Sequence, residues 1–259
     1  MEDKMAGEVL NPHARGRSGP AMPANSGTSL PAPGLSPGTL HNIFLDGPAG
    51  RLEAVLNEGR ADTAFAAVVC HPHPLGGGTL HNKVVYHAAK VFAGMGWPVL
   101  RFNFRSVGLS AGAHDGRAEI ADVCTALDWL NQRYRKPIFA AGFSFGAAMG
   151  LAACCADSRV SAFAALGLPT HAEGRDYHYH FLSRCRLPKL LLSGDRDQFA
   201  PVAQLRTVAE AAAAPTELQL IHGADHFFTG HLTAMQTVLR HWVTSHSPCG
   251  QPPGAEERQ

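Results

Sequence analysis

Strand-length runs that are mostly apolar alternate with amphipathic, helix-length stretches over most of the chain. The runs are Ala66–Cys70, Pro98–Phe104, Ile138–Gly142, Val160–Gly167, Leu187–Gly194 and Thr216–Ile221. A strand without polar alternation fits a sheet that is covered on both faces. The alternation therefore predicts the α/β fold class, with a doubly wound, mostly parallel sheet and helices on both sides. Right-handed crossovers would place the carboxyl ends of the strands, and with them the reactive loops, along one edge.

The predicted sheet begins with a hairpin and lies between two polar tails. His41–Leu45 and Leu52–Leu56 are short extended pieces joined by a Gly/Pro turn, which predicts an edge hairpin. Residues 1–38 are rich in Pro, Gly, Ser and Ala and lack apolar periodicity, so we expect a disordered tail. We expect one folded domain over residues 39–247 and a flexible tail over residues 248–259.

The charge balance excludes several classes of partner. The chain has 22 Lys and Arg against 21 Asp and Glu, a net charge of +1. No block of one sign indicates nucleic acid or a membrane surface as a partner.

The longest apolar runs have the length of strands, so no transmembrane helix is expected. The N-terminus also lacks the apolar segment of a secretory signal.

The spacing and the setting of the cysteines indicate whether the chain is found in a reducing or an oxidising compartment. The six cysteines show no C-x-x-C spacing, and most of them lie inside or beside apolar runs, where cysteine acts as a small hydrophobic residue. We predict a reducing, cytoplasmic setting without structural disulfides.

A G-x-S-x-G pentapeptide, Gly142–Gly146, lies between an apolar strand and a helix of small residues that runs from Ala147 to Cys155. This is the context that a nucleophile elbow needs, in which a sharp turn exposes the hydroxyl of Ser144. Glycines at both ends of the pentapeptide leave space where a Cβ would collide with the neighbouring strand or helix. The pentapeptide alone is a weak signal, and it gains weight only if an acid and a histidine follow it.

Both partners follow on later strand ends. Asp195 and Asp197 come directly after the strand Leu187–Gly194, and His226 follows the next one. We predict Asp197 as the acid and His226 as the general base, with Asp195 as a turn carboxylate and the competing candidate. Serine needs a base that removes its proton and later returns it to the leaving group, and a buried aspartate fixes the tautomer of that base. The order Ser, Asp, His is the order of α/β-hydrolases.

An oxyanion hole requires two backbone N–H donors. Phe145, which follows the serine, is predicted to supply one, and the loop after Ala66–Cys70 the other. Proline has no N–H, so within His71-Pro72-His73-Pro74 only the two histidines can donate. His73 occupies the variable position of the H-G-x-P form of such a loop, and we predict its amide as the second donor. Leu75 is the alternative.

These residues together carry a resemblance that covers about residues 40 to 246. The chain resembles the α/β-hydrolase superfamily, and within it the small capless hydrolases related to dienelactone hydrolases and acyl-peptidase catalytic domains. The segments that carry the resemblance are His71–Pro74, Asn82–Val85, Arg101–Arg105, Val107-Gly108 and Gly142–Gly146. The resemblance implies an eight-stranded sheet, a serine hydrolase mechanism and no cofactor, and it implies no particular substrate.

The chain departs from that pattern in two places and lacks room for a lid. Ser106 stands where a glycine is usual, and His71-Pro72 replaces the commoner His-Gly. Residues 168–187, where larger relatives insert a lid, are too few for a helical lid domain. We therefore expect an open site and a small-molecule acyl substrate of modest size, whose binding residues the sequence does not identify.

Several alternatives stay open. A carboxylesterase acting on small to medium acyl chains is the leading hypothesis. A thioesterase, a lactone hydrolase and an acyl-peptide hydrolase share the same triad, and a non-catalytic interaction protein on the same fold is the second class. The H-x-H pairs at residues 71 and 73 and at residues 178 and 180 lack a third ligand at a suitable spacing, so no metal site is predicted.

Overall fold

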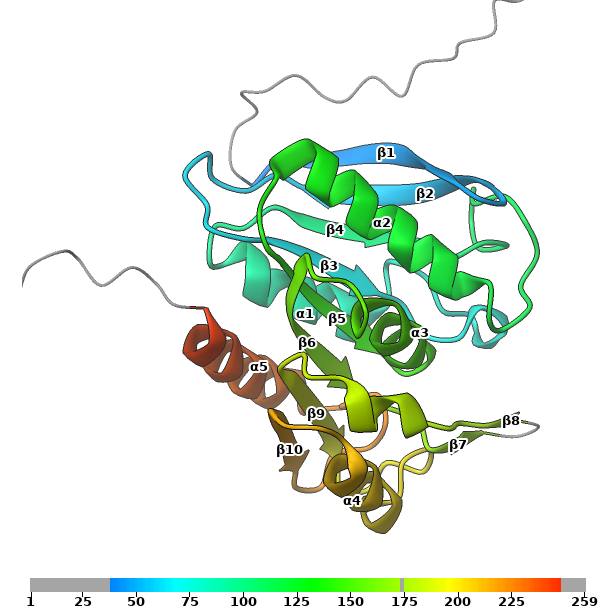
Figure 1. Ribbon diagram of the computed structural model, residues 1–259, viewed down its shortest axis with the longest axis vertical. Coiled ribbons are helices and arrows are strands. Elements are labelled where there is room, and N and C mark those ends of the chain that lie inside the picture. The colour runs from blue at the N-terminus through cyan, green and yellow to red at the C-terminus, as the bar shows by residue number, and fades with distance from the viewer. Residues whose placement is uncertain (1–37, 173–174, 248–259) are drawn as a thin grey trace, which may run out of the picture.

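The computed structural model describes residues 38–172 and 175–247, so the two predicted tails lie almost entirely outside the described residues. Eight strands form one sheet (Figure 1), in the order β1-β2-β4-β3-β5-β6-β9-β10. They are β1 (Leu40–Gly47), β2 (Gly50–Asn57), β3 (Ala66–Cys70), β4 (Val99–Phe102), β5 (Ile138–Phe143), β6 (Val160–Leu166), β9 (Lys189–Gly194) and β10 (Thr216–Ile221). The helices are α1 (Lys83–Ala93), α2 (Glu119–Tyr134), α3 (Phe145–Cys154), α4 (Val202–Ala211) and α5 (Leu232–His246).

The pairing of the strands follows the predicted pattern. β1 and β2 form an antiparallel hairpin at one edge, and β2 also pairs antiparallel with β4. Every other pair in the large sheet is parallel. The register aligns Cys70 at the end of β3 with Gly142 near the end of β5, and Leu166 at the end of β6 with Leu192 in β9. The loops that follow these strands therefore meet at one edge of the sheet.

Two hydrophobic cores lie on the two faces of the sheet. One core packs side chains of α2, α3 and α4 against the strands, and the other packs α1 and α5 (Figure 1). Along β5, Ile138 and Ala140 belong to the first core, whereas Phe139, Ala141 and Phe143 belong to the second. Because both faces are covered, a central strand must be apolar at every position, which is the pattern that the sequence shows.

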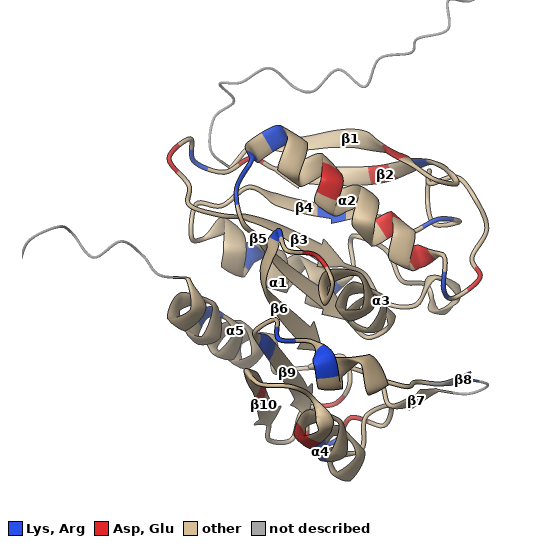
Figure 2. Ribbon diagram, in the orientation of Figure 1, with Lys and Arg blue, Asp and Glu red and all other residues tan. Residues whose placement is uncertain are grey.

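The segment between β6 and β9 contains no lid domain within the described residues. It forms a hairpin of two-residue strands, β7 (His171–Ala172) and β8 (Arg175–Asp176), and a short 3₁₀ helix, η2 (His180–Arg184). The expected absence of a lid is thus confirmed. Charged positions of both signs are interspersed over the fold (Figure 2). No helix among the described residues is long and apolar enough to cross a membrane.

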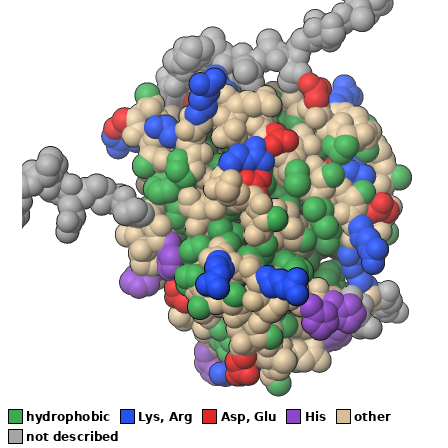
Figure 3. Space-filling model, in the orientation of Figure 1, with side chains coloured by type: hydrophobic (Ala, Val, Ile, Leu, Met, Phe, Trp, Pro, Cys, Tyr) green, Lys and Arg blue, Asp and Glu red, His purple; other side chains and the backbone are tan. Residues whose placement is uncertain are grey.

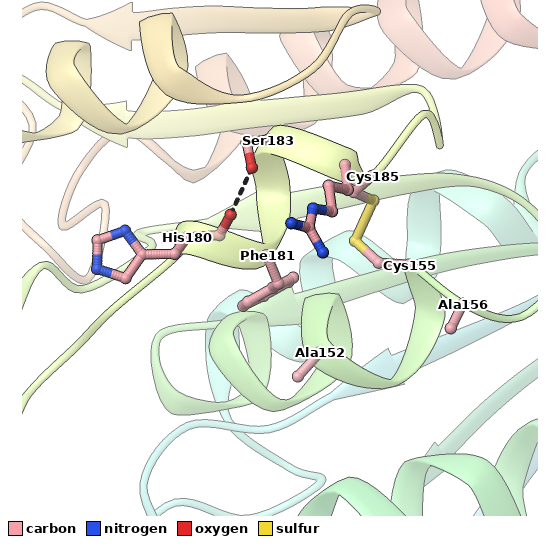
Figure 4. A pocket seen from close by; sticks show the side chains of 8 residues that line it. Ala152, Cys155, Ala156, His180, Phe181, Ser183 and Cys185 are labelled. Atoms are coloured by element: carbon pink, nitrogen blue, oxygen red, sulfur yellow. Dashed lines mark hydrogen bonds between the residues drawn. A yellow bond between two sulfur atoms is a disulfide. The ribbon is translucent and has the colours of Figure 1, made fainter.

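A disulfide joins Cys155, at the end of α3, to Cys185, directly after η2, and their Cα atoms are 5.2 Å apart (Figure 4). The prediction of a chain without structural disulfides is therefore wrong. The two residues are 30 positions apart in the sequence, and only the return of η2 over α3 brings them together. Of the remaining described cysteines, Cys70 and Cys154 are free and buried, as expected of small hydrophobic residues. The cytoplasmic setting, which rested partly on the cysteines, stays a prediction.

A groove of about 670 Å³ borders the disulfide. Hydrophobic side chains gather over α3 on the face drawn in Figure 3. The residues that line the groove are Ala152, Cys155, Ala156, His180, Phe181, Ser183, Arg184 and Cys185 (Figure 4). This groove is separate from the cleft that contains Ser144.

Candidate active site

Ser144 occupies a sharp turn between β5 and α3, with φ 55° and ψ −120°. Residues other than glycine rarely adopt this backbone conformation. A Cβ on Gly142 would lie 2.3 Å from the carbonyl oxygen of Gly146, and a Cβ on Gly146 would lie 2.4 Å from that of His71. Only glycine fits at either position, as the sequence predicts. The turn leaves the Ser144 side chain partly exposed in a cleft.

The structure brings Ser144, His226 and Asp197 together. The Nε2 atom of His226 lies 2.9 Å from the Ser144 hydroxyl, and its Nδ1 atom lies 2.9 and 3.0 Å from the two carboxylate oxygens of Asp197. A carboxylate only accepts, so Nδ1 carries the proton and Nε2 faces the serine as an acceptor. Asp197 is 4% exposed and His226 2%, so water competes little for these hydrogen bonds.

Two further donors hold the carboxylate of Asp197. The Ser193 hydroxyl donates to Oδ2 at 2.8 Å, and the Phe199 amide donates to Oδ1 at 2.9 Å. Burial alone would raise the pKa of Asp197. The hydrogen bonds with His226, Ser193 and Phe199 outweigh burial and lower the pKa below its ordinary value. Asp197 therefore stays ionised at neutral pH. Ser193 was not predictable from the sequence, because a serine within an apolar strand carries no distinctive signal.

Asp195 has a different role in the turn. It accepts a hydrogen bond from the Gly223 amide at 2.7 Å and pairs with Nδ1 of His222, also at 2.7 Å. It thereby fastens the end of β9 to the loop after β10. The structure places Asp197, and not Asp195, against His226, in line with the sequence-based choice between them.

The loop after β3 carries the predicted oxyanion donors. It contains a 3₁₀ turn, η1 (Pro74–Gly76), and the His73 carbonyl accepts from the amides of Gly76 and Gly78. The amides of His73 and Phe145 donate to no acceptor among the described residues. The Leu75 amide, the alternative donor, is occupied by Nδ1 of the His73 ring at 3.2 Å. Of the two, the His73 amide is thus the free one.

His71 anchors this loop as a buried neutral imidazole. Its Nδ1 donates to the Pro72 carbonyl at 2.6 Å, and its Nε2 accepts from the Phe104 amide at 2.9 Å. These partners require the Nδ1-protonated tautomer, because Nε2 must present a lone pair. Burial lowers the pKa of His71 to about 4. His71 is thus a structural link between the loops after β3 and β4.

This link predicts a specific loss of stability in weak acid. The unfolded chain binds a proton at His71 near pH 6.5 and the folded chain only near pH 4, so acid favours unfolding between these values. The free energy of unfolding is expected to fall by roughly 2 kcal/mol between pH 7.5 and pH 5 on account of His71. Urea titrations of the wild-type protein and of His71→Gln at both pH values measure this. The variant should be less stable at pH 7.5 but lose roughly 2 kcal/mol less on acidification.

An equal loss in both proteins would contradict the assignment. The pKa of His73 is also lowered, chiefly by burial, so a smaller pH dependence is expected to persist in the variant.

A cleft of about 600 Å³ opens beside Ser144. The lining residues are Pro72, His73, Leu75, Gly76, Gly77, Gly78, Asn82, Ser144, Pro169, Ala172, Arg175, Tyr177, Phe199, His226 and Phe227. The segment Tyr177–Phe181 lies partly in the wall of the cleft and partly on the surface. Tyr177 lines the cleft, whereas His178 and His180 are exposed.

Asn103 and Arg105 hold the neighbouring loop instead of facing the cleft. Asn103 accepts from the Leu80 amide at 2.8 Å and donates to Glu53 at 2.8 Å. Arg105 forms a buried two-pronged ion pair with Asp122, with a closest approach of 2.7 Å. Ser106 has φ 66°, which explains why a glycine is usual there. Among the described residues, no three His, Cys, Asp or Glu side chains are grouped so as to hold a metal ion.

Comparisons with known proteins identify the family and the fold of the chain. A family model described as an alpha/beta hydrolase domain matches residues 66–247. An uncharacterised protein from Rickettsia prowazekii is 35% identical over 194 residues, which cover 72% of this chain and 81% of the relative. A solved alpha-beta serine hydrolase homologue from Coxiella burnetii is 33% identical, with a TM-score of 0.70 over 78% of this chain and 96% of that chain. A solved serine hydrolase without a lid from Xanthomonas campestris is 32% identical, with a TM-score of 0.73 over 84% of this chain and 100% of that chain.

Proposed function

The chain belongs to the α/β-hydrolase family, and we propose that it is a serine-dependent hydrolase that cleaves small to medium acyl esters through a seryl acyl-enzyme. The observation that carries the proposal is the continuous series of hydrogen bonds from Asp197 through His226 to Ser144. Each atom in the series has the donor or acceptor character that the chemistry requires.

In the first half-reaction, His226 Nε2 accepts the hydroxyl proton while Ser144 Oγ attacks the ester carbonyl carbon. The carbonyl oxygen becomes an oxyanion, and the free amides of His73 and Phe145 are the donors for it. Asp197 stabilises the imidazolium that forms. His226 then gives its proton to the leaving alkoxide, and the acyl group stays on Ser144.

In the second half-reaction, water takes the place of the alcohol. His226 removes a proton from the water, and the hydroxide attacks the acyl carbon. His226 then gives this proton to the Ser144 oxygen as the bond between that oxygen and the acyl carbon breaks. The carboxylic acid product departs through the cleft, which no lid domain covers within the described residues. The lidless relative from Xanthomonas campestris supports an open site of this kind. An open cleft of about 600 Å³ suits a small or medium acyl ester.

Covalent labelling tests the proposal directly. A fluorophosphonate probe reacts with a serine hydroxyl only where a base activates it, so the wild-type protein is expected to form a stoichiometric adduct at Ser144. Intact-protein mass spectrometry followed by peptide mapping identifies the modified residue. His226→Ala should remove the labelling, because the base is lost, whereas His222→Ala should retain it. Absence of labelling in folded wild-type protein would favour an interaction protein on the same fold.

A further inference from the structure

Arg175 is the one residue with a permanent charge among the described residues that line the Ser144 cleft. It lies in β8, within the short hairpin that stands where larger relatives carry a lid. The other lining residues are apolar, glycine or neutral polar, apart from His73 and His226. A charge at a cleft wall loses part of its hydration, and a ligand of opposite charge can replace the hydration that is lost.

Two aromatic rings hold the guanidinium in place. Its central carbon lies 5.2 Å from the centre of the Phe145 ring and 4.9 Å from the centre of the Tyr177 ring. Nη2 donates to the Gly116 carbonyl. A guanidinium has five N–H donors, and among the described residues this is the one hydrogen bond that the Arg175 side chain makes. Its planar group is therefore positioned by its neighbours while most of its donors remain unused.

Among the described residues, no carboxylate forms an ion pair with Arg175. Glu119, a buried carboxylate of the same region, is engaged by Nδ1 of His114 at 2.6 Å. His73 adds no competing charge. Burial first, and then the charges of His114 and Arg175, lower the pKa of His73, so its ring is neutral at pH 7. The cleft therefore carries one fixed positive charge with no partner among the described residues.

We propose that Arg175 selects anionic substrates: the cleft takes esters that carry a free carboxylate, which the guanidinium binds while Ser144 attacks the ester carbonyl. This inference rests on the proposed serine hydrolase function and names its substrate class. A single planar guanidinium matches a carboxylate, because two parallel N–H donors meet its two oxygens. The described residues that line the cleft include no second fixed cation, which a phosphate dianion would be expected to recruit.

Paired substrates of equal size test this inference. One pair places the charge on the acyl side, mono-p-nitrophenyl adipate against p-nitrophenyl hexanoate. The other places it on the leaving group, 4-acetoxybenzoate against 4-acetoxybenzamide. For at least one pair, the wild-type protein should prefer the anion. Arg175→Gln should reduce kcat/KM for that anion by roughly 10- to 100-fold, mainly through KM, and change the neutral ester by less than about 3-fold.

Two variants separate recognition from folding. Arg175→Lys keeps the positive charge but loses the two parallel N–H donors of the guanidinium. This variant should retain part of the preference for the anionic ester. Arg184→Gln makes the same chemical change on the exposed arginine of η2, which borders the other groove, and should leave both substrates unaffected. Raising the salt concentration should weaken only the hydrolysis of the anion.

The possible failures are distinguishable. If the wild-type protein hydrolyses the neutral esters but shows no preference for either anion, the role of Arg175 is overturned and the proposed function stands. Equal losses on charged and neutral esters in Arg175→Gln would also overturn it, since Arg175 would then only support Phe145. A preference for a phosphate-bearing thioester over both carboxylates would overturn the carboxylate assignment. If no ester is hydrolysed at all, the proposed function itself fails.

Discussion

Ser144→Ala is expected to lower the hydrolysis of p-nitrophenyl acetate by roughly 10⁴- to 10⁶-fold in kcat. The hydroxyl that His226 contacts at 2.9 Å is the nucleophile of the proposed reaction, and without it the seryl ester cannot form. Steady-state kinetics on purified protein measure the loss. The residual rate would reflect the oxyanion donors and binding alone.

The alanine variant should fold as the wild type does. Alanine has the same backbone restriction as serine, so the strain at φ 55° is unchanged and the melting temperature should move little. Ser183→Ala is a matched control, because that hydroxyl donates to the His180 carbonyl within η2 and lies outside the cleft. Undiminished turnover by a folded Ser144→Ala protein would refute the serine mechanism.

Asp197→Asn is expected to reduce kcat by roughly 10³- to 10⁴-fold, while Asp195→Asn changes it by less than about 3-fold. The amide group of asparagine can donate a hydrogen bond to Nδ1 of His226. That arrangement favours the tautomer with the proton on Nε2, which cannot accept the proton of Ser144. The amide also leaves the imidazolium without a compensating charge.

The two aspartates make an internally controlled comparison, since they lie two positions apart in one turn. Asp195 is bonded to His222 and Gly223, so its replacement should lower the melting temperature modestly and leave the chemistry intact. A comparable loss of kcat in both variants would show that the turn as a whole, and not the Asp197 carboxylate, is required. Loss in Asp195→Asn alone would reverse the assignment.

The fold follows from the sequence to a large extent, because its strongest signals are local. β3, β5 and β6 are apolar at nearly every position, and that pattern specifies a sheet covered on both faces. The edge hairpin is marked by the turn between Leu45 and Leu52, which pair with each other in the structure. The strand that follows α1 was expected over Pro98–Phe104 but covers only Val99–Phe102. Beyond it, the Asn103 amide still donates to the Glu53 carbonyl of β2 at 2.7 Å, but the Phe104 amide donates to the side chain of His71, so the strand ends there.

The site was predictable only where residue type and strand order suffice. Ser144, Asp197 and His226 each follow a predicted strand, so the parallel topology alone brings them to one edge. Arg175 and the Cys155–Cys185 bond were not predictable in this way. Both depend on how residues 168–187 return over α3, and that path is set by packing between distant segments. The apolar runs that contain most of the cysteines, Cys155 among them, even suggested the opposite of a bond.

The backbone conformation at Ser144 lowers the stability of the fold, and the proposed activity requires the serine side chain at that position. Its φ of 55° and ψ of −120° are unstrained only for glycine. A residue with a side chain there lowers the free energy of unfolding by on the order of 1–3 kcal/mol. A glycine at this position would relieve the cost and would also remove the nucleophile. Substitutions that stabilise the fold tend to be tolerated unless they remove a function. If Ser144 served no reaction, its replacement by glycine would therefore be tolerated. A lineage that used this fold only for binding would be expected to lose Ser144 before it lost Gly142 or Gly146.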